Sequence, residues 1–262
     1  MKILVCIKQV PDSWAEKKLS PAKVLDRESA DAVLNDLDEY AVEEALRIVE
    51  ANGGVEAGHT ITLISMGPER AQEALRKGLS MGADSALHIS DDALAGSDAL
   101  TTSRVLAEVI KRESPDLILT GTESTDARMS VVPAMLSERL DMPHLSFAGE
   151  VNVDVNAKVI KTKRMTDEGV EAMESTMPVI VTVIEKINEP RYPSFKGIMA
   201  AKKKPITNKS LSDLGLPVDQ VKPWSAVNNV TVLPPRSSGI KIEDSGDAGN
   251  KLADFLAEKK LI

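Results

Sequence analysis

The stretch Thr60-Ile61-Thr62-Leu63-Ile64-Ser65-Met66-Gly67-Pro68-Glu69-Arg70 changes its pattern halfway along. Its first seven residues are mostly aliphatic or β-branched and carry no charge, which favours a buried strand. Gly67 and Pro68 then end this run, and proline is well suited to the first turn of a helix. We therefore predict a strand over 60–66 and a helix from there to Met81, which Gly82 ends.

The same alternation of strand and helix continues on both sides of this stretch. The remaining predicted strands cover 2–8, 86–89 and 117–121, and the remaining predicted helices cover 36–51 and 97–112. Strands that alternate with helices of this length imply right-handed crossovers and a parallel sheet covered on both faces. The first part of the chain, about 140 residues, is therefore predicted to be α/β, a Rossmann-like doubly wound unit.

The pattern changes after Gly149. Residues 151–155 and 158–164 alternate polar with apolar side chains, which indicates strands with one wet face. We predict that they form an antiparallel hairpin appended to the sheet. Residues 178–184 are again continuously apolar and are expected to return to the main sheet.

The last part of the chain is proline-bearing and loose up to a final amphipathic helix over 249–258. Such a segment buries little surface by itself. We expect a Rossmann-like nucleotide-binding domain over 1–204 and an extended C-terminal arm over 205–262.

Composition excludes several classes of function. The 262 residues carry a formal net charge of −8, which does not favour binding to nucleic acid or to an anionic membrane. No apolar run approaches the roughly 20 residues that cross a bilayer, and the N-terminus does not read as a signal peptide, so we expect a cytoplasmic protein without membrane insertion. Cys6 is the single cysteine, which excludes an internal disulfide framework and a cysteine-rich metal site.

Motifs for catalysis are missing from the sequence. It contains neither of the common glycine-rich phosphate-binding motifs, nor a nucleophile elbow or a zinc-protease motif. His59, His88 and His144 lie far apart, and we interpret them as surface or strand-edge histidines rather than as metal ligands or a catalytic base.

Ligands of parallel α/β sheets bind at the carboxyl ends of the strands. The small, hydroxyl-bearing run Gly121-Thr122-Glu123-Ser124-Thr125-Asp126 follows such a strand, and we predict a helix that begins near 128–130 after it. Backbone N–H groups there, with Ser124, Thr125 and Ser130, could hold a phosphate, and Asn35, Asp36 and Asp38 could face the same crevice. Ordinary helix capping and turn formation explain these residues equally well. Cys6 lies inside the first strand, where a thiol usually acts as a small apolar side chain.

The segment Asn188-Glu189-Pro190-Arg191-Tyr192-Pro193-Ser194-Phe195 combines two prolines with an arginine and two of the few aromatic residues. Arginine and tyrosine are frequent at the centres of interfaces, and a stiff segment loses little entropy on binding. The residues alone leave two interpretations open, a docking loop for a partner or a loop packed on its own domain. The lysines at 202–204 read as an ordinary solvated face.

Several ordered motifs give the chain a resemblance to a known family, the small (beta) subunit of electron-transfer flavoproteins. They extend over essentially the whole chain and comprise Lys2-Ile3-Leu4-Val5-Cys6-Ile7-Lys8-Gln9-Val10-Pro11, Ala41-Val42-Glu43-Glu44-Ala45, Gly78-Leu79-Ser80-Met81-Gly82-Ala83-Asp84, the stretch 163–182, Asn188-Glu189-Pro190-Arg191-Tyr192 and Ile198-Met199-Ala200-Ala201-Lys202-Lys203-Lys204.

This resemblance implies a heterodimer in which the large (alpha) subunit holds most of the FAD contacts and the small subunit binds a structural AMP. It further implies an electron carrier without catalytic turnover of its own, which passes electrons from acyl-CoA dehydrogenases or related flavoprotein dehydrogenases to a membrane quinone oxidoreductase of the respiratory chain. The AMP contacts would then be Cys6, Asn35, Asp36, Leu37, Asp38, Met66, Gly121, Thr122, Glu123, Ser124, Thr125, Asp126, Ser130, Val131 and Val132.

The resemblance also assigns the segment 188–204 to a recognition loop that docks the dehydrogenase. Its partner-binding residues would be Glu189, Pro190, Arg191, Tyr192, Phe195, Ile198 and Met199. Phe195 stands where the family commonly has an anchoring leucine, and the C-terminal helix is expected to pack on the large subunit.

Two alternatives to this assignment remain. In electron-bifurcating relatives the crevice takes a second FAD through an Asp-Gly-Asp-Thr type of sequence, which Asp126-Ala127-Arg128-Met129 does not reproduce, so AMP is the expected ligand. A free-standing domain that binds or hydrolyses adenine nucleotides would leave the long arm and the proline-rich loop unexplained.

Overall fold

The computed structural model describes residues 1–262 except 232 and 237. Contacts divide the chain into a first unit, Met1–Val227, and a second unit, Asn228–Ile262. The strands are β1 (Lys2–Cys6), β2 (Gln9–Pro11), β3 (Ala32–Leu34), β4 (Thr60–Met66), β5 (Ser85–Ile89), β6 (Leu117–Gly121), β7 (His144–Asp154), β8 (Val159–Thr166), β9 (Gly169–Thr176), β10 (Val179–Val183) and β11 (Ile206–Lys209). The α-helices are α1 (Asp36–Ala51), α2 (Gln72–Met81), α3 (Ala99–Glu113), α4 (Val132–Leu140), α5 (Phe195–Ala201) and α6 (Ala248–Glu258).

Nine of these strands form one sheet in the order β11-β5-β4-β1-β6-β10-β7-β8-β9. Every pairing from β11 to β7 is parallel, and the pairings of β7 with β8 and of β8 with β9 are antiparallel. The strands β2 and β3 pair antiparallel in a small second sheet. The prediction of an α/β, Rossmann-like and mainly parallel sheet is confirmed.

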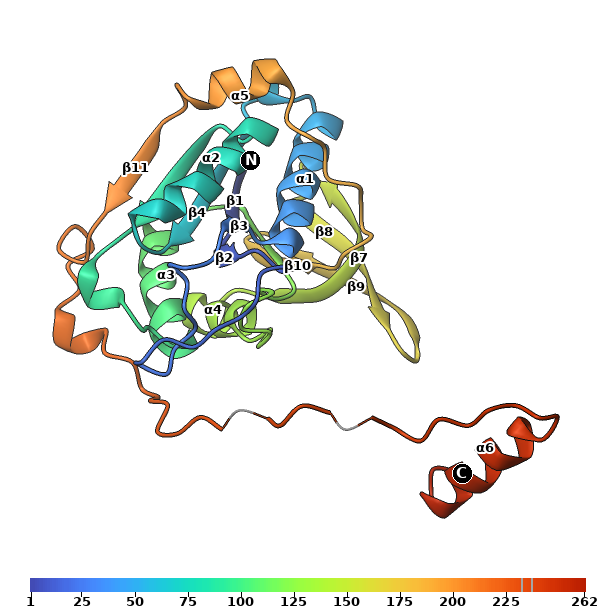
Figure 1. The fold of residues 1–262 in the computed structure, drawn as a ribbon. Helices are drawn as coiled ribbons and strands as arrows, with labels where there is room; N and C mark the ends of the chain where they lie inside the picture. Colours follow the sequence, from blue (N-terminus) through green and yellow to red (C-terminus); the bar gives the residue numbers. More distant parts are fainter. Residues whose placement is uncertain (232, 237) are drawn as a thin grey trace. The chain divides into compact units, whose positions relative to one another are not determined.

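Alternating side chains of the central strands separate the core into two layers. Ile3 and Val5 of β1 pack with α1 and α2, whereas Leu4 between them packs in a second cluster with α3 and α4. Figure 1 shows α1 and α2 on one side of the sheet and α3 on the other. Because both faces are covered, the strands can be continuously apolar, which is the pattern that predicted them.

The antiparallel extension is larger than the expected hairpin. It has three strands, since β9 adds to β7 and β8 over a register of eight residue pairs. Most residues of β9 are exposed, and its sequence GVEAMEST lacks a regular apolar alternation. A strand with so little burial leaves no hydrophobic period in the sequence, which is why it was missed.

The expected domain boundary between 204 and 205 lies inside the first unit and is corrected. The strand β11 pairs with β5 at the edge of the sheet, and the backbone N–H of Ala86 donates to the carbonyl of Pro205. Leu211, Leu214 and Val221 are then buried in the core cluster. A proline is tolerated at an edge strand, so Pro205 does not end the domain.

The second unit contains α6, which starts one residue before the predicted helix. None of its residues, all of which the structure describes, is buried within the chain. Among the described residues no helix is both long and apolar enough to span a membrane.

Candidate functional site

The start of α1 is tied to the loop that follows β6. Asn35 is completely buried, and its side-chain amide donates to the carbonyl of Glu123 at 2.9 Å. Its amide oxygen accepts from the backbone N–H of Thr125 at 3.0 Å. A buried amide needs such partners, so this pair of bonds fixes the two segments against each other. Two of the segments predicted to line one crevice are thus brought together.

Gly121 lies directly against the first turn of α1. A Cβ atom at this position would come within 2.7 Å of the backbone C and O of Leu37 and of Oδ1 of Asp38. Only glycine permits this approach, and the requirement is steric because its φ is not left-handed. The end of β6 therefore supports α1 without a side chain between them.

Two titratable groups lie at this junction, Asp38, which is buried, and Cys6, which is half-buried. Burial raises the pKa of Asp38 to about 7, although hydrogen bonds from Asn35 and from the backbone N–H of Lys8, the latter at 2.8 Å, oppose the shift. Burial, together with the nearby Asp38 carboxyl, raises the pKa of Cys6 to about 12. The Cys6 thiol is therefore protonated at neutral pH and acts as a packing group.

Basic side chains surround Asp126 in the loop 121–126. Its carboxylate is 1% exposed and forms ion pairs with Lys8, at 2.9 Å, and with Arg27. Burial alone would raise the pKa of Asp126, but Lys8, Ser124 and Arg27 hold it at about 2. Lys17 also reaches the loop and donates to the carbonyl of Thr125 at 3.3 Å.

These basic residues were missed by the sequence reasoning. Lys8 carried one usable signal, because it is the last residue of the predicted strand 2–8 and so stands at its carboxyl end. Lys17 and Arg27 lie in a segment without regular periodicity, so their approach to 121–126 depends on tertiary structure.

The chain turns sharply between this loop and α4. Arg128 and Ser130 have φ values of 48° and 55°, in the left-handed region. Glu123 accepts from the hydroxyl of Ser130 at 3.1 Å and lies 3.4 Å from the guanidinium of Arg128. The helix begins at Val132 rather than near 128–130, because these two left-handed residues interrupt helical geometry.

Four of the predicted contact residues lie in two further places. Cys6, Met66 and Val132 pack against the same apolar cluster, on the α3 and α4 side of the sheet. Asp36 lines a hollow between α1 and α2 instead. The predicted crevice would thus lie between these apolar side chains and the polar loop 121–126.

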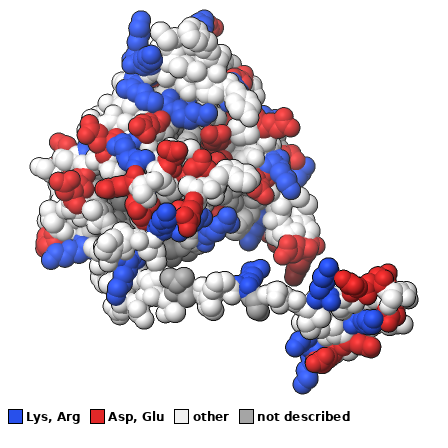
Figure 2. All heavy atoms as spheres, viewed as in Figure 1, with Lys and Arg blue, Asp and Glu red and all other residues white. Residues whose placement is uncertain are grey.

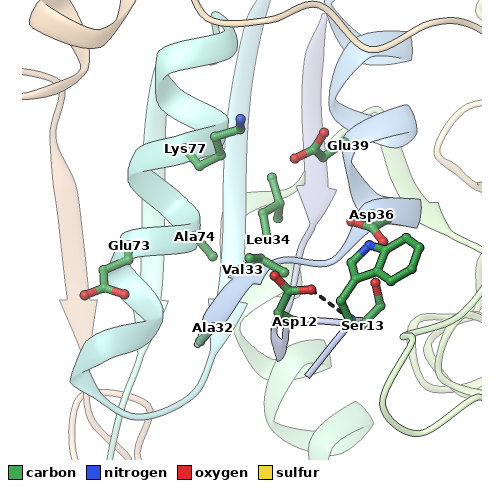
Figure 3. A pocket seen from close by; sticks show the side chains of 11 residues that line it. Asp12, Ser13, Ala32, Val33, Leu34, Asp36, Glu39, Glu73, Ala74 and Lys77 are labelled. Atoms are coloured by element: carbon green, nitrogen blue, oxygen red, sulfur yellow. Dashed lines mark hydrogen bonds between the residues drawn. The ribbon is translucent and has the colours of Figure 1, made fainter. Parts of the chain in front are cut away.

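The hollow has a volume of about 460 Å³ and is lined by Asp12, Ser13, Trp14, Ala32, Val33, Leu34, Asp36, Glu39, Glu73, Ala74 and Lys77. Figure 3 shows Glu39 of α1 and Lys77 of α2 pointing toward each other above Leu34. Its four carboxylates exceed its single lysine, so the hollow would repel a phosphate group.

The segment 188–199 combines tight anchoring with exposed apolar side chains. Asn188 donates to Glu44 at 3.0 Å, and Arg191 forms ion pairs with Glu43 at 2.7 Å and Glu50 at 2.6 Å. Tyr192 is 94% exposed and Phe195 80%, and Ile198 and Met199 of α5 are also exposed. The loop is thus bonded to its own domain through Asn188 and Arg191 while its aromatic side chains stay exposed, so it combines features of both interpretations.

The interpretation of the histidines was wrong for two of the three. His59 and His88 are buried, with ring nitrogens bonded to the N-terminal amine and to Asn208, and His144 contacts the hydroxyl of Thr182 at 2.7 Å. Within the described part of the chain, no group of three or more His, Cys, Asp or Glu side chains could hold a metal ion.

Charges of both signs are interspersed on the face that Figure 2 shows. A doubly wound, mainly parallel sheet, polar side chains gathered at the carboxyl ends of its strands and an exposed aromatic loop define an α/β protein of Rossmann-like type.

Comparison with known proteins identifies the family within this class. Residues 22–214 match the family model described as electron transfer flavoprotein domain. The chain is 46% identical to the electron transfer flavoprotein subunit beta of Mycobacterium leprae over 265 residues, covering 99% of both chains. It is 34% identical to the subunit of the same name from Megasphaera elsdenii, covering 99% of this chain and 97% of the relative. The chain therefore belongs to the beta-subunit family of electron transfer flavoproteins, proteins of electron transport.

A third relative carries a different name. The caffeyl-CoA reductase-Etf complex subunit CarD of Acetobacterium woodii is 37% identical, again with 99% of this chain and 97% of the relative covered.

Proposed function

We propose that this chain is the small subunit of a heterodimeric electron carrier. The alpha subunit would hold most of the FAD, and the chain itself would bind AMP and dock an acyl-CoA dehydrogenase or a related flavoprotein dehydrogenase. Electrons would then pass to a membrane quinone oxidoreductase. The carrier would work in the cytoplasm and would catalyse no turnover of its own.

One observation carries this proposal. The chain, which belongs to the beta-subunit family, combines a cluster of buried polar groups beside β6 with a loop, 188–199, that exposes apolar side chains. The predicted crevice would be internal and lined by polar groups such as Asn35, whereas the loop 188–199 exposes apolar side chains. A bound nucleotide that never leaves suits the first, and a partner that comes and goes suits the second.

AMP fits the crevice through the chemistry of its lining. Lys8 and Arg27 share the single carboxylate of Asp126, so together with Lys17 they leave an excess of positive charge beside the loop 121–126. The first turn of α4 supplies backbone N–H groups that lack helical partners, apart from Pro133, which has none. Cys6, Met66 and Val132 offer an apolar side for an adenine ring. Bound there, AMP would stabilise the fold by filling a crevice between polar elements.

Phe195 would be the anchor of the docking loop, with Tyr192, Ile198 and Met199 around it. All four side chains are exposed in the chain alone, and the loop that carries them is stiffened by two prolines. An aromatic side chain presented in this way can enter a partner pocket at low entropic cost. The unburied helix α6 would pack on the alpha subunit.

Nucleotide analysis of the heterodimer tests this proposal. Co-expression with the alpha subunit should give a yellow complex of one subunit each, and heating should release AMP in an amount equal to the complex. A complex that releases no adenine nucleotide beyond its FAD would refute the AMP assignment.

A second candidate is a bifurcating subunit that holds its own FAD in the crevice. The likeness to the subunit of a caffeyl-CoA reductase-Etf complex favours it, while Asp126-Ala127-Arg128-Met129 does not. The flavin count separates the two, because AMP predicts one flavin per heterodimer and the alternative predicts two.

A further inference from the structure

We propose that Arg191 does not bind the partner but clamps the docking loop onto α1, so that Tyr192 and Phe195 are presented in a fixed arrangement. This inference rests on the proposed docking role of the loop. It assigns Arg191 the part of a positioning residue and revises the expectation that it contacts the dehydrogenase.

The contacts of Arg191 use most of its hydrogen-bonding capacity. Its Nε and Nη2 donate to the carboxylate of Glu43 at 2.7 and 2.9 Å, and its Nη1 and Nη2 donate to that of Glu50 at 2.6 and 3.0 Å. The backbone N–H of Arg191 adds a bond to Glu43 at 3.2 Å. Paired bonds between a guanidinium and a carboxylate fix orientation as well as distance. With two carboxylates bound, the guanidinium offers little to a third.

The two glutamates are placed to receive a single arginine. Glu43 and Glu50 are seven residues apart, which is about two helical turns, so both project from the same side of α1. The Glu43 side chain is only 6% exposed, and a carboxylate this far from water needs a charged partner. The ion pair with Arg191 offsets the cost of removing the Glu43 carboxylate from water.

A second contact lies beside the first. Glu44 is also buried, and the side-chain amide of Asn188 donates to its carboxylate at 3.0 Å and to the carbonyl of Tyr40 at 3.1 Å. The adjacent buried glutamates of α1 are thus both satisfied from the loop. The loop is therefore bonded to α1 at two adjacent positions, by Arg191 at Glu43 and by Asn188 at Glu44.

The exposed residues lie between two fixed points. Arg191 holds one end, and at the other Ser194 caps α5 by accepting from the backbone N–H of Gly197 at 3.1 Å. Tyr192 and Phe195 project to solvent from this short span. A loop held in its binding arrangement loses less entropy when a partner binds, so the clamp acts on affinity rather than on electron transfer within the complex.

Trypsin tests the clamp independently of function, because it must take the Arg191 side chain into its own pocket. In the heterodimer, the double variant Glu43→Gln with Glu50→Gln should be cleaved after Arg191 about tenfold faster than the wild type. Glu56→Gln, an exposed site on the same unit, is the matched control and should leave the rate unchanged. An equal rate in the double variant and the wild type would overturn the clamp. Mass spectrometry of the peptide that ends at Arg191 gives the rate.

Electron transfer from a dehydrogenase to the heterodimer tests the consequence. Arg191→Ala should raise KM for the docked pair about tenfold and leave kcat within about twofold, and Arg191→Lys should recover part of the loss because it keeps one charge but not the fork. The double glutamine variant should raise KM in the same way. If Arg191→Ala raised KM while the double variant left it unchanged or lowered it, Arg191 would be a direct partner contact and the proposal would be wrong.

The two assays separate this inference from the proposed function. A wild-type heterodimer that accepts no electrons from any dehydrogenase would count against the docking role, and the cleavage rates would still decide whether the clamp exists.

Discussion

The crevice beside β6 and the loop 188–199 are both held by buried polar contacts, but they use them in opposite ways. In the crevice, Asn35 and Asp126 draw neighbouring segments together and close the structure over itself. In the loop, Arg191 and Asn188 hold the backbone down so that Tyr192 and Phe195 remain outside. The first arrangement suits a ligand that is retained, and the second suits a partner that is exchanged.

This difference shows how one helix can serve two sites. The first turn of α1 packs against Gly121, and its middle and last turns carry Glu43 and Glu50. Damage to the first turn should therefore affect stability, whereas removal of an exposed side chain from the loop should affect docking alone. The following substitutions test that separation.

Gly121→Ala should have the largest effect. The added methyl group would lie 2.7 Å from the backbone of Leu37, and backbone cannot move aside as a flexible side chain can. We expect a loss of about 3 kcal/mol in the free energy of unfolding. Urea unfolding of the chain measures it, with Gly239→Ala as control because a Cβ there meets no atom within 4 Å. Equal stability of the two variants would show that the end of β6 does not support α1.

Phe195→Ala should leave stability and flavin content unchanged and weaken docking. The side chain is 80% exposed in the chain alone, so its removal costs no packing. An anchor in a partner pocket contributes about 2 kcal/mol, which corresponds to a rise of about 30-fold in the dehydrogenase concentration that half-saturates transfer. Val55→Ala, at another exposed apolar residue, is the control. Unchanged transfer would remove Phe195 as the anchor.

The parallel sheet was predictable because its signals are local. The bounds of α1, β4 and β6 agree with the sequence patterns, since continuous apolar runs and a 3.6-residue period reflect burial on the sheet. The strands β9 and β11 were missed or placed outside the domain, because one is mostly exposed and the other follows a proline. A short edge strand depends on its neighbour for its conformation, and no local pattern reports that neighbour.

The candidate site was predictable only in part. Topology placed Asn35, Asp38 and the loop after β6 together, since strand ends and helix starts meet at one edge of a doubly wound sheet. Two of the basic residues around the loop 121–126 could not be predicted, because Lys17 reaches the carbonyl of Thr125 and Arg27 reaches Asp126 from 108 and 99 residues away. The ion pairs of Arg191 with α1 could not be predicted either. Glu43 and Glu50 precede it by 148 and 141 residues, and no local sequence pattern indicates such a pairing.

Asp38→Asn should give the smallest effect, a change in the free energy of unfolding. It tests the comparison between the crevice and the loop 188–199 at a buried carboxyl of the crevice. The pKa of Asp38 is raised to about 7, so the folded chain holds this proton more tightly than the unfolded chain does. The stability that this group contributes is therefore complete below about pH 4 and is lost as the pH rises to about 7. Asparagine does not titrate, so the free energy of unfolding of the nucleotide-free variant should depend less on pH than that of the wild type. At pH 8 the variant should be the more stable of the two, by on the order of 1 kcal/mol.

Urea unfolding at pH 5 and pH 8 measures this difference, with Asp36→Asn, exposed in the same turn, as the matched change of charge. The opposing result is equally informative. If Asp38→Asn were less stable than the wild type at pH 8, the hydrogen bonds from Lys8 and Asn35 would outweigh burial, and Asp38 would be a charged tie like Asp126. In that case each buried carboxylate of the crevice would have partners that offset its burial. The loop has the same arrangement, because Arg191 neutralises the buried Glu43. The two regions would then differ only in the side chains that they expose.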